Sequence, residues 1–134
     1  INKRLVDGKR ARKILPENIK LGSAVEQSSN LAGFIAGLYE EDYDLIGKSM
    51  IDLFAEPHRS KLIPHYKDLK NSAFESGALG CGISGSGPSI FAFSKSEEVA
   101  KNIGDNFFNS FGKYDINSTS YYSKINLNPP KILD

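Results

Sequence analysis

The stretch GALGCGISGSGPSIFAF, Gly77 to Phe93, decides the fold of this chain. Its last part, Ser89 to Phe93, is a short apolar run rich in residues that favour strands. We expect Leu79 to Ser84 to pair with this run. The letters GSGP between the two supply glycines for positive φ and a proline that fixes a turn. The stretch therefore predicts a β-hairpin.

The glycines of this hairpin are more numerous than a turn requires. They alternate at Gly80, Gly82, Gly85 and Gly87. Alternating glycines remove side chains from one face, which allows another backbone or a ligand to lie close. Backbone N–H groups in such a loop can form a concavity that binds anions, and Ser84 and Ser86 add hydroxyls. From the residues alone, a purely structural hairpin and a loop that contacts a ligand are equally supported.

Composition bounds the function classes. The chain has 134 residues, which suits one domain, and 40% of them are hydrophobic. The one cysteine, Cys81, excludes an internal disulfide and fits a cytoplasmic location. No apolar run is long enough to span a bilayer, so we expect no membrane partner. The net charge of +1 gives no electrostatic reason to expect nucleic acid.

Basic residues crowd the beginning of the chain. They are Lys3, Arg4, Lys9, Arg10, Arg12 and Lys13. A solvated helix face is the simpler interpretation. The alternative is that one or two of these arginines bind an anion, because the planar guanidinium pairs bidentately with a carboxylate or phosphate.

Helical periodicity covers most of the remaining chain. Helices are predicted over residues 8–19, 21–42, 42–54, 55–77 and 98–111. Pro16 is expected to end the first helix or to start its next turn, and Pro64 to kink or restart the fourth. Pro57 lies where a first helical turn tolerates proline. Asp42 is a predicted N-cap, and Ser94 with Glu97 is a predicted capping box. Gly77 and Gly112 are predicted helix stops. The apolar helix stripes, which include Val25, Ser28, Ala32, Ile35 and Tyr39, are predicted to be core.

The order of elements predicts an α+β fold. Residues 117–127, rich in β-branched and aromatic side chains, are a predicted strand. One further strand near Ile1, or just before it, would give the order β-α-β-β-α-β. We therefore expect a ferredoxin-like split β-α-β arrangement with an antiparallel sheet and additional helices.

Four sequence stretches resemble a known kinase superfamily. GCGISGSGPSIFAF resembles the third motif of the superfamily of galactokinase, homoserine kinase, mevalonate kinase and phosphomevalonate kinase. ARKILP, Ala11 to Pro16, and AEPHRSKLIPHY, Ala55 to Tyr66, resemble the homoserine kinase family in particular. NLAGFIAGLY is similar to the first long helix that follows the active-site cleft in that family. The similarity extends from about Lys9 to Ile125.

The resemblance implies a phosphotransferase that moves the γ-phosphate of ATP, with Mg²⁺, to the hydroxyl of L-homoserine in threonine biosynthesis. Arg12 and Arg59 match the arginines expected to hold the carboxylate of the amino acid. The loop residues expected to line the substrate cleft are Gly82, Ser84, Gly85 and Ser86. Glu56 is expected either to orient Arg59 or to be a plain surface carboxylate.

The resemblance concerns the C-terminal domain of such an enzyme. We expect residues 1–134 to form a single domain without the N-terminal ATP-binding domain, whose P-x-x-x-G-L-G-S-S-A loop has no counterpart here. No residue of this part is predicted to be catalytic or to hold a metal. We expect no tight binding of ATP or Mg²⁺ to this chain alone, and no activity from it alone. L-homoserine, an N-terminal kinase domain and a second copy of the chain are the expected partners.

Two other functions fit the same residues. One is a related small-molecule kinase of the superfamily, acting on a mevalonate-type or sugar substrate. The other is a non-catalytic ferredoxin-like module that binds amino acids or mediates assembly. Cys81 is predicted to be a buried, inert thiol, because no catalytic partner is evident. His58 and His65 lack further ligands that would complete a zinc site.

Overall fold

A computed structural model describes residues 8–129 and residue 132. The predicted strand near Ile1, together with Lys3 and Arg4, lies outside the described residues. The helices are α1 (Gly8–Lys13), α2 (Leu21–Glu40), α3 (Tyr43–Ser49), α4 (Glu56–Arg59), the 3₁₀ helix η1 (Ser60–Leu62), α5 (Tyr66–Glu75) and α6 (Glu97–Gly112). The strands are β1 (Gly80–Ile83) and β2 (Ile90–Phe93). The α+β class is thus confirmed.

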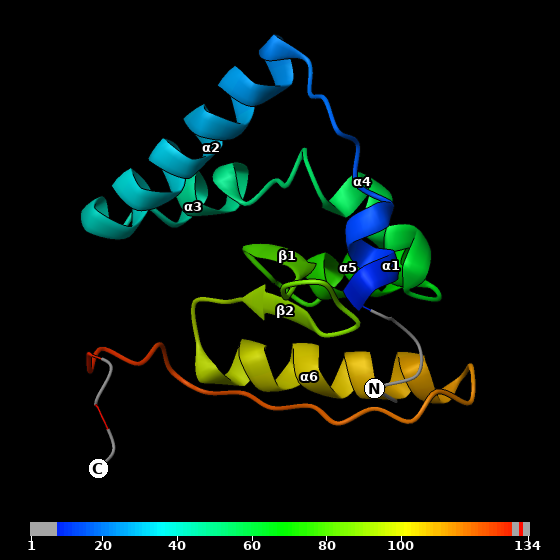
Figure 1. Cartoon of the computed structure of the whole chain (residues 1–134). Coiled ribbons are helices and arrows are strands. Elements are labelled where there is room, and N and C mark those ends of the chain that lie inside the picture. The colour runs from blue at the N-terminus through cyan, green and yellow to red at the C-terminus, as the bar shows by residue number, and fades with distance from the viewer. Residues whose placement is uncertain (1–7, 130–131, 133–134) are drawn as a thin grey trace.

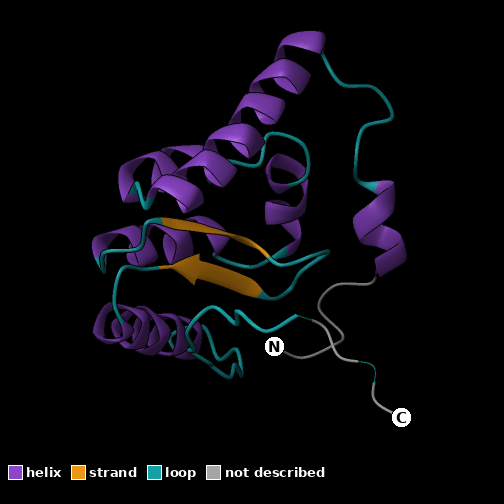
Figure 2. Ribbon diagram, turned by 90° about the vertical axis from the view of Figure 1, so that its left-hand side faces the viewer, coloured by secondary structure: helices purple, strands orange, loops and turns teal. Residues whose placement is uncertain are grey.

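The predicted hairpin lies at the centre of the molecule, between α2 and α3 on one side and α6 on the other (Figures 1 and 2). β1 and β2 are antiparallel, with Gly80 opposite Phe93 and Ile83 opposite Ile90. Ser84 N donates to Ser89 O at 2.8 Å, which extends the pairing toward the turn. The expected hairpin is confirmed in position.

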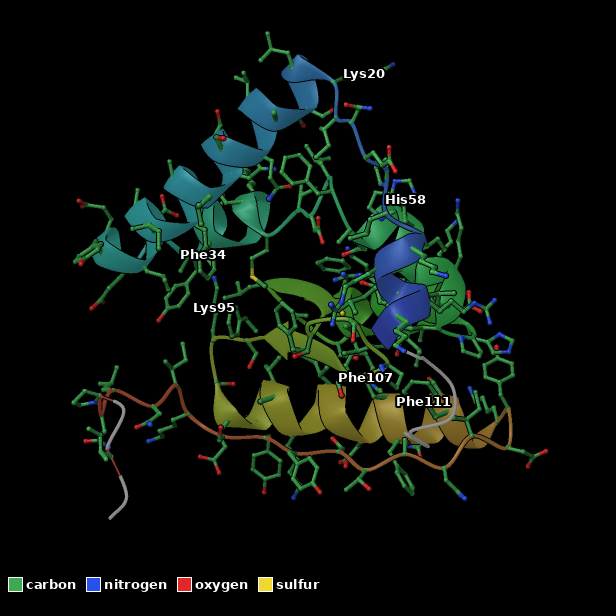
Figure 3. All side chains as sticks on the ribbon, viewed as in Figure 1. Lys20, Phe34, His58, Lys95, Phe107 and Phe111 are labelled. Atoms are coloured by element: carbon green, nitrogen blue, oxygen red, sulfur yellow. The ribbon has the colours of Figure 1, made fainter. Side chains whose placement is uncertain are left out.

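One face of the hairpin packs on α5 and α6. Cys81 lies there between Ala73 of α5 and Ile103 of α6, and all three are buried. Val99 and Phe107, which lie at helical spacing with Ile103 on α6, pack against this cluster. Figure 3 shows Phe107 on the side of α6 that faces the hairpin. Burial of these side chains is the main apolar contribution that holds α6 to the sheet.

The other face of the hairpin lacks side chains at its glycine positions. A Cβ at Gly80 would lie 2.4 Å from the sulfur of Met50. The side chain of Met50 therefore occupies the space that Gly80 leaves, as expected for a strand glycine at a close approach. Phe34 of α2 stacks on Phe93 at 6.1 Å between ring centroids. At Gly80, the neighbour that the glycine accommodates is a protein side chain.

Local sequence signals explain the helix boundaries. The Asp42 carboxylate accepts hydrogen bonds from Asp44 N and Leu45 N, so the predicted N-cap of α3 is confirmed. Pro57 occupies the first turn of α4, and Gly77 has φ +93° after α5. α1 ends at Lys13, well before residue 19, because Pro16 disfavours helical backbone at the residue before it.

Three expectations about boundaries are corrected. The N-cap of α6 is Ser96, whose Oγ accepts from Val99 N, whereas the Ser94 hydroxyl donates to Ser96 O. α6 includes Gly112 instead of stopping before it. α3 ends at Ser49, because the Asp52 carboxylate binds the backbone N–H groups that a continued helix would use.

The predicted strand at residues 117–127 is not formed. This segment runs back along α6 without regular secondary structure, and Tyr121 and Leu127 are exposed (Figure 1). A strand is stabilised by pairing with a neighbour. In a split β-α-β arrangement the last strand pairs with the first one, and the predicted first strand lies outside the described residues. The ferredoxin-like detail is therefore not confirmed.

The predicted burial of the α2 stripe was wrong. α2 packs on α3 through its other side, where Gly33 and Gly37 let Ser49 and Ile46 approach. Val25, Ile35 and Tyr39 are exposed. An apolar stripe is typical of a covered helix face, yet the covered side of α2 in the described structure is the one that carries Gly33 and Gly37.

Candidate functional site

Arg59 lies at the centre of the candidate site. Its Nε donates a hydrogen bond to Ala11 O at 3.2 Å, and its Nη1 donates to Gly85 O at 2.8 Å. These bonds join the end of α4 to α1 and to the turn of the hairpin. They span 48 and 26 residues of sequence, so three distant stretches of the chain meet at one guanidinium.

The turn of the hairpin is built around Gly85. Gly87 N donates to Ser84 O at 3.1 Å, and Gly85 has φ +60°. A glycine with positive φ at the first central position is typical of a tight hairpin turn. Within the described residues, the N–H groups of Gly85 and Ser86 make no hydrogen bond. Two consecutive N–H groups in such a turn can bind an anion.

The six residues that were predicted to contact the substrate differ in exposure and in surroundings. Arg12 is exposed on the last turn of α1, next to the Ala11 carbonyl that Arg59 binds. Ser84 and Gly85 are exposed, and Ser86 is half-buried. Gly82 is buried in β1, and a Cβ there would lie 3.2 Å from the ring of Phe91. The structure thus brings Arg59, α1 and the turn together, while Gly82 faces an aromatic ring.

Glu56 and Lys70 form an ion pair beneath β1. The Lys70 ammonium binds Oε1 of Glu56, and their side chains are 22% and 16% exposed, respectively. Glu56 is therefore neither a plain surface carboxylate nor, in the described structure, bonded to Arg59. Because Glu56 begins α4 and Arg59 ends it, the ion pair fixes this short helix against α5.

Asp52 determines where α4 begins. Its Oδ1 accepts from Phe54 N and Ala55 N at 2.8 Å each, and its Oδ2 accepts from Glu56 N at 3.0 Å. A carboxylate just before a helix satisfies N–H groups that would otherwise lack partners. Asp52 therefore contributes to the position of Arg59 one turn later, although it does not touch Arg59.

Sequence reasoning missed Asp52 and Lys70. An aspartate three residues before AEPHR is a recognisable turn and cap signal, so Asp52 could have been found. Lys70 gave no comparable signal, because 14 residues separate it from Glu56 and only the fold brings the two together.

Two buried groups near the pair have perturbed acidities. Burial raises the pKa of Cys81 to about 12, and the Glu56 carboxylate adds to the increase while Lys70 opposes it. Burial also raises the pKa of Tyr66, with a contribution from the negative charge of Glu56. The buried position expected for Cys81 is confirmed, and its thiol is protonated at neutral pH.

The described residues offer no metal centre. No group of three His, Cys, Asp or Glu side chains in this part of the chain is placed to hold a metal ion. None of the helices in residues 8–129 is both long and apolar enough to cross a membrane. A hollow of about 1260 Å³ lies between β2, α6 and the segment around 118–127, and the six predicted contact residues do not line it.

Comparison with known proteins identifies the family. Residues 34–113 match the family model described as GHMP kinases C terminal. The chain belongs to this family. It is 52% identical over 94 residues to homoserine kinase of Chlorobium phaeobacteroides, which covers 70% of this chain and 29% of that protein. It is 48% identical over 101 residues to homoserine kinase of Chlorobaculum tepidum, which covers 75% of this chain and 31% of that protein.

A solved structure agrees with the family and the fold. The crystal structure of homoserine kinase from Cytophaga hutchinsonii is 49% identical, with a TM-score of 0.90. The match covers 96% of this chain and 41% of that one. This GHMP kinase C-terminal domain therefore spans less than half the length of the relatives it matches.

Proposed function

We propose that this GHMP kinase domain is the C-terminal part of an enzyme that transfers the γ-phosphate of ATP to the hydroxyl of L-homoserine in threonine biosynthesis. The observation that carries the proposal is the pair of bonds from Arg59 to Ala11 and Gly85. They join three of the four stretches on which the family resemblance rests. The homoserine kinase names of relatives that are about half identical support this substrate over mevalonate or a sugar.

In this proposal, the domain anchors and orients the amino acid. Arg59 and the exposed Arg12 supply guanidinium groups for the carboxylate of homoserine, because a guanidinium pairs with a carboxylate in a fixed geometry. The N–H groups of Gly85 and Ser86, which make no hydrogen bond within the described residues, bind an anionic group of a substrate in this proposal. Ser84 adds an exposed hydroxyl at the edge of the turn. Such anchoring makes the transfer faster by holding the attacking hydroxyl in a reactive orientation.

The groups that hold ATP belong, in this proposal, to an N-terminal kinase domain. The described residues lack a metal-ligand cluster, so we assign no Mg²⁺ ligand among them. Bound Mg²⁺ and ATP would supply the phosphoryl group and neutralise its charge. This chain would contribute one wall of the cleft, and the enzyme would act in the cytoplasm.

The test is complementation in trans. The chain is mixed with the N-terminal domain of a homoserine kinase, and ADP release is measured with ATP, Mg²⁺ and L-homoserine. We expect release that depends on both parts and on L-homoserine, and none with mevalonate or galactose. Circular dichroism of each part confirms that both are folded.

Arg59→Ala is the site variant of the same test. Loss of charge-assisted hydrogen bonds should raise KM for L-homoserine by about 10- to 100-fold. Release that is supported equally by mevalonate would assign a different substrate. A folded mixture that releases no ADP with any of the three substrates would favour a non-catalytic module instead.

A further inference from the structure

A polar cluster of Glu56, Tyr66 and Lys70 lies beneath β1. The Lys70 ammonium of α5 binds Oε1 of Glu56, the first residue of α4, and both side chains are largely covered. Tyr66 is 6% exposed, and the centroid of its ring lies 6.0 Å from the Lys70 ammonium. Because little water reaches the two charges, their attraction is stronger than that of a pair on the surface. The pair therefore joins α4 to α5 through two particular atoms.

The second oxygen of Glu56 faces the hairpin. A Cβ added at Gly82 of β1 would lie 3.9 Å from Oε2 of Glu56. The carboxylate thus contacts Lys70 through one oxygen and faces β1 with the other. β1 ends at Ile83 and leads directly into the glycine-rich turn that Arg59 binds. A displacement of Glu56 would therefore be felt both in α4 and next to the strand that leads into this turn.

α4 is too short to fix its own direction. It consists of Glu56–Arg59, and a helix of this length is not stable by itself. Its start is held by Asp52, which accepts from Glu56 N at 3.0 Å, and by the bond of Lys70 to the Glu56 side chain. Arg59 N donates to Ala55 O at 2.8 Å, which closes the single turn. The position of the Arg59 guanidinium therefore depends on how the start of this turn is held.

Stability alone does not explain an ion pair at this place. Well-packed apolar side chains in place of a buried ion pair often leave stability unchanged or raise it, because the two charges lose their hydration on burial. What the pair supplies is a directional contact between one nitrogen and one oxygen. Such a contact suits a residue that holds another group in a defined position.

Direct contact between Lys70 and a substrate explains the arrangement less well. The ammonium is bound to Glu56, and an anion that took it over would leave this carboxylate without its partner. Lys70 is also only 22% exposed, whereas Ser84 and Gly85 in the turn that Arg59 binds are exposed. The lysine is thus placed to act on Arg59 through α4.

We propose that Lys70 is a positioning residue for Arg59. Its bond to Glu56 holds α4 so that the guanidinium of Arg59 meets the carboxylate of L-homoserine. Because this role takes L-homoserine as the substrate, it rests on the proposed function. Lys70 acts on binding of the amino acid and not on phosphoryl transfer. Its loss should therefore raise KM for L-homoserine with little change in kcat or in KM for ATP.

The first test is steady-state kinetics of the chain complemented with the N-terminal domain of a homoserine kinase. Lys70→Met should raise KM for L-homoserine by about tenfold and change kcat and KM for ATP by less than about twofold. Lys70→Arg keeps a cation for Glu56, and its KM should stay within about threefold of the wild-type value. Lys48→Met, which removes the exposed pair with Asp44, is the matched control and should leave all three constants unchanged. Circular dichroism confirms that each variant is folded.

A double-mutant cycle tests whether Lys70 acts through Arg59. Lys70→Met should lower kcat/KM for L-homoserine by about tenfold in the wild-type background and have almost no further effect in the Arg59→Ala background. A general loss of folded protein would lower kcat/KM by the same factor in both backgrounds. Equal factors would therefore overturn the positioning role.

The Nε–H group of Arg59 reports its position without substrate. It donates to Ala11 O, so its NMR signal in the chain alone should exchange slowly with water. Lys70→Met should make this exchange about fivefold faster or more through local opening, and Lys48→Met should not. A wild-type KM for L-homoserine in Lys70→Met overturns the inference and leaves the proposed function intact. A folded wild-type mixture that does not use L-homoserine overturns the proposed function, and the exchange of the Nε–H group then decides whether Lys70 positions Arg59.

Discussion

The guanidinium of Arg59 binds the backbone carbonyl of Gly85, so the turn of the hairpin is held by a residue from a different helix. A glycine-rich turn has many accessible conformations, so a contact from outside the turn adds to the order that its own Gly87–Ser84 hydrogen bond provides. The second bond of Arg59, to Ala11, holds α1 beside the same turn. The side chain of Arg59 therefore holds the glycine-rich turn in a defined position.

The first prediction concerns Arg59→Lys. Lysine keeps the charge but has one nitrogen, so it cannot bind Ala11 O and Gly85 O in the geometry of Nε and Nη1. We expect faster hydrogen exchange of the backbone N–H groups of Ser84 and Gly87, which are hydrogen-bonded in this turn. We also expect KM for L-homoserine to rise by about tenfold in the complemented enzyme. Arg10→Lys, an exposed change on α1, is the control. Unchanged exchange in Arg59→Lys would mean that the turn is ordered without Arg59.

Local signals made much of the fold predictable. Asp42 caps α3, Pro57 lies in the first turn of α4, and Gly77 follows α5, as the sequence indicated. Each of these effects depends on neighbours within a few residues, so these helix boundaries can be predicted from the local sequence. The hairpin was predictable for the same reason.

Long-range contacts were not predictable in this way. The pair of Lys70 with Glu56 and the bonds of Arg59 to Ala11 and Gly85 depend on where helices pack. The stripe of α2 predicted a packed face, but the face that packs on α3 is the opposite one, where Gly33 and Gly37 allow close approach. The segment 117–127 has the composition of a strand, yet composition does not supply the neighbouring strand that pairing needs.

The second prediction compares two caps. Asp52→Ala and Asp42→Ala each remove a carboxylate that binds N–H groups at a helix start. Each should lower the free energy of unfolding by about 1 kcal/mol in urea titrations. Only Asp52→Ala should also raise KM for L-homoserine in the complemented enzyme, because Asp52 fixes the helix that carries Arg59. Equal KM values for the two variants would show that the Asp52 cap does not affect the substrate site.

The third prediction concerns the ion pair of Glu56 and Lys70. Lys70→Met leaves a largely buried carboxylate without its partner and should lower the free energy of unfolding by about 2–3 kcal/mol. Adding Glu56→Gln to this variant should recover part of the loss. Lys48→Met is the matched control, because the Lys48–Asp44 pair is 73% and 78% exposed and should contribute little. Urea titrations of the four proteins measure these effects, and equal losses from Lys70→Met and Lys48→Met would contradict the role of burial.

The fourth prediction concerns stability at alkaline pH. Burial raises the pKa of Cys81 from 9.0 to about 12, so the thiol stays protonated in the folded chain while it ionises in the unfolded one. The contribution of Cys81 is therefore fully present below about pH 9 and is lost as the pH rises toward 12. Between about pH 8 and 10.5 the wild type should lose about 2 kcal/mol more than Cys81→Ala, at about 1.4 kcal/mol per pH unit above the unfolded pKa.

The comparison with Cys81→Ala isolates the thiol from other groups that ionise at high pH. Tyr66, whose pKa is raised mainly by burial and to a smaller extent by Glu56 and Cys81, is present in both proteins, so the part of its contribution that comes from burial cancels in the difference between their losses. The alanine also removes packing atoms, but that cost does not depend on pH. Urea titrations at the two pH values give the four free energies. Parallel losses in the two proteins would mean that Cys81 ionises as readily in the folded chain as in the unfolded one, which its position between Ala73 and Ile103 opposes.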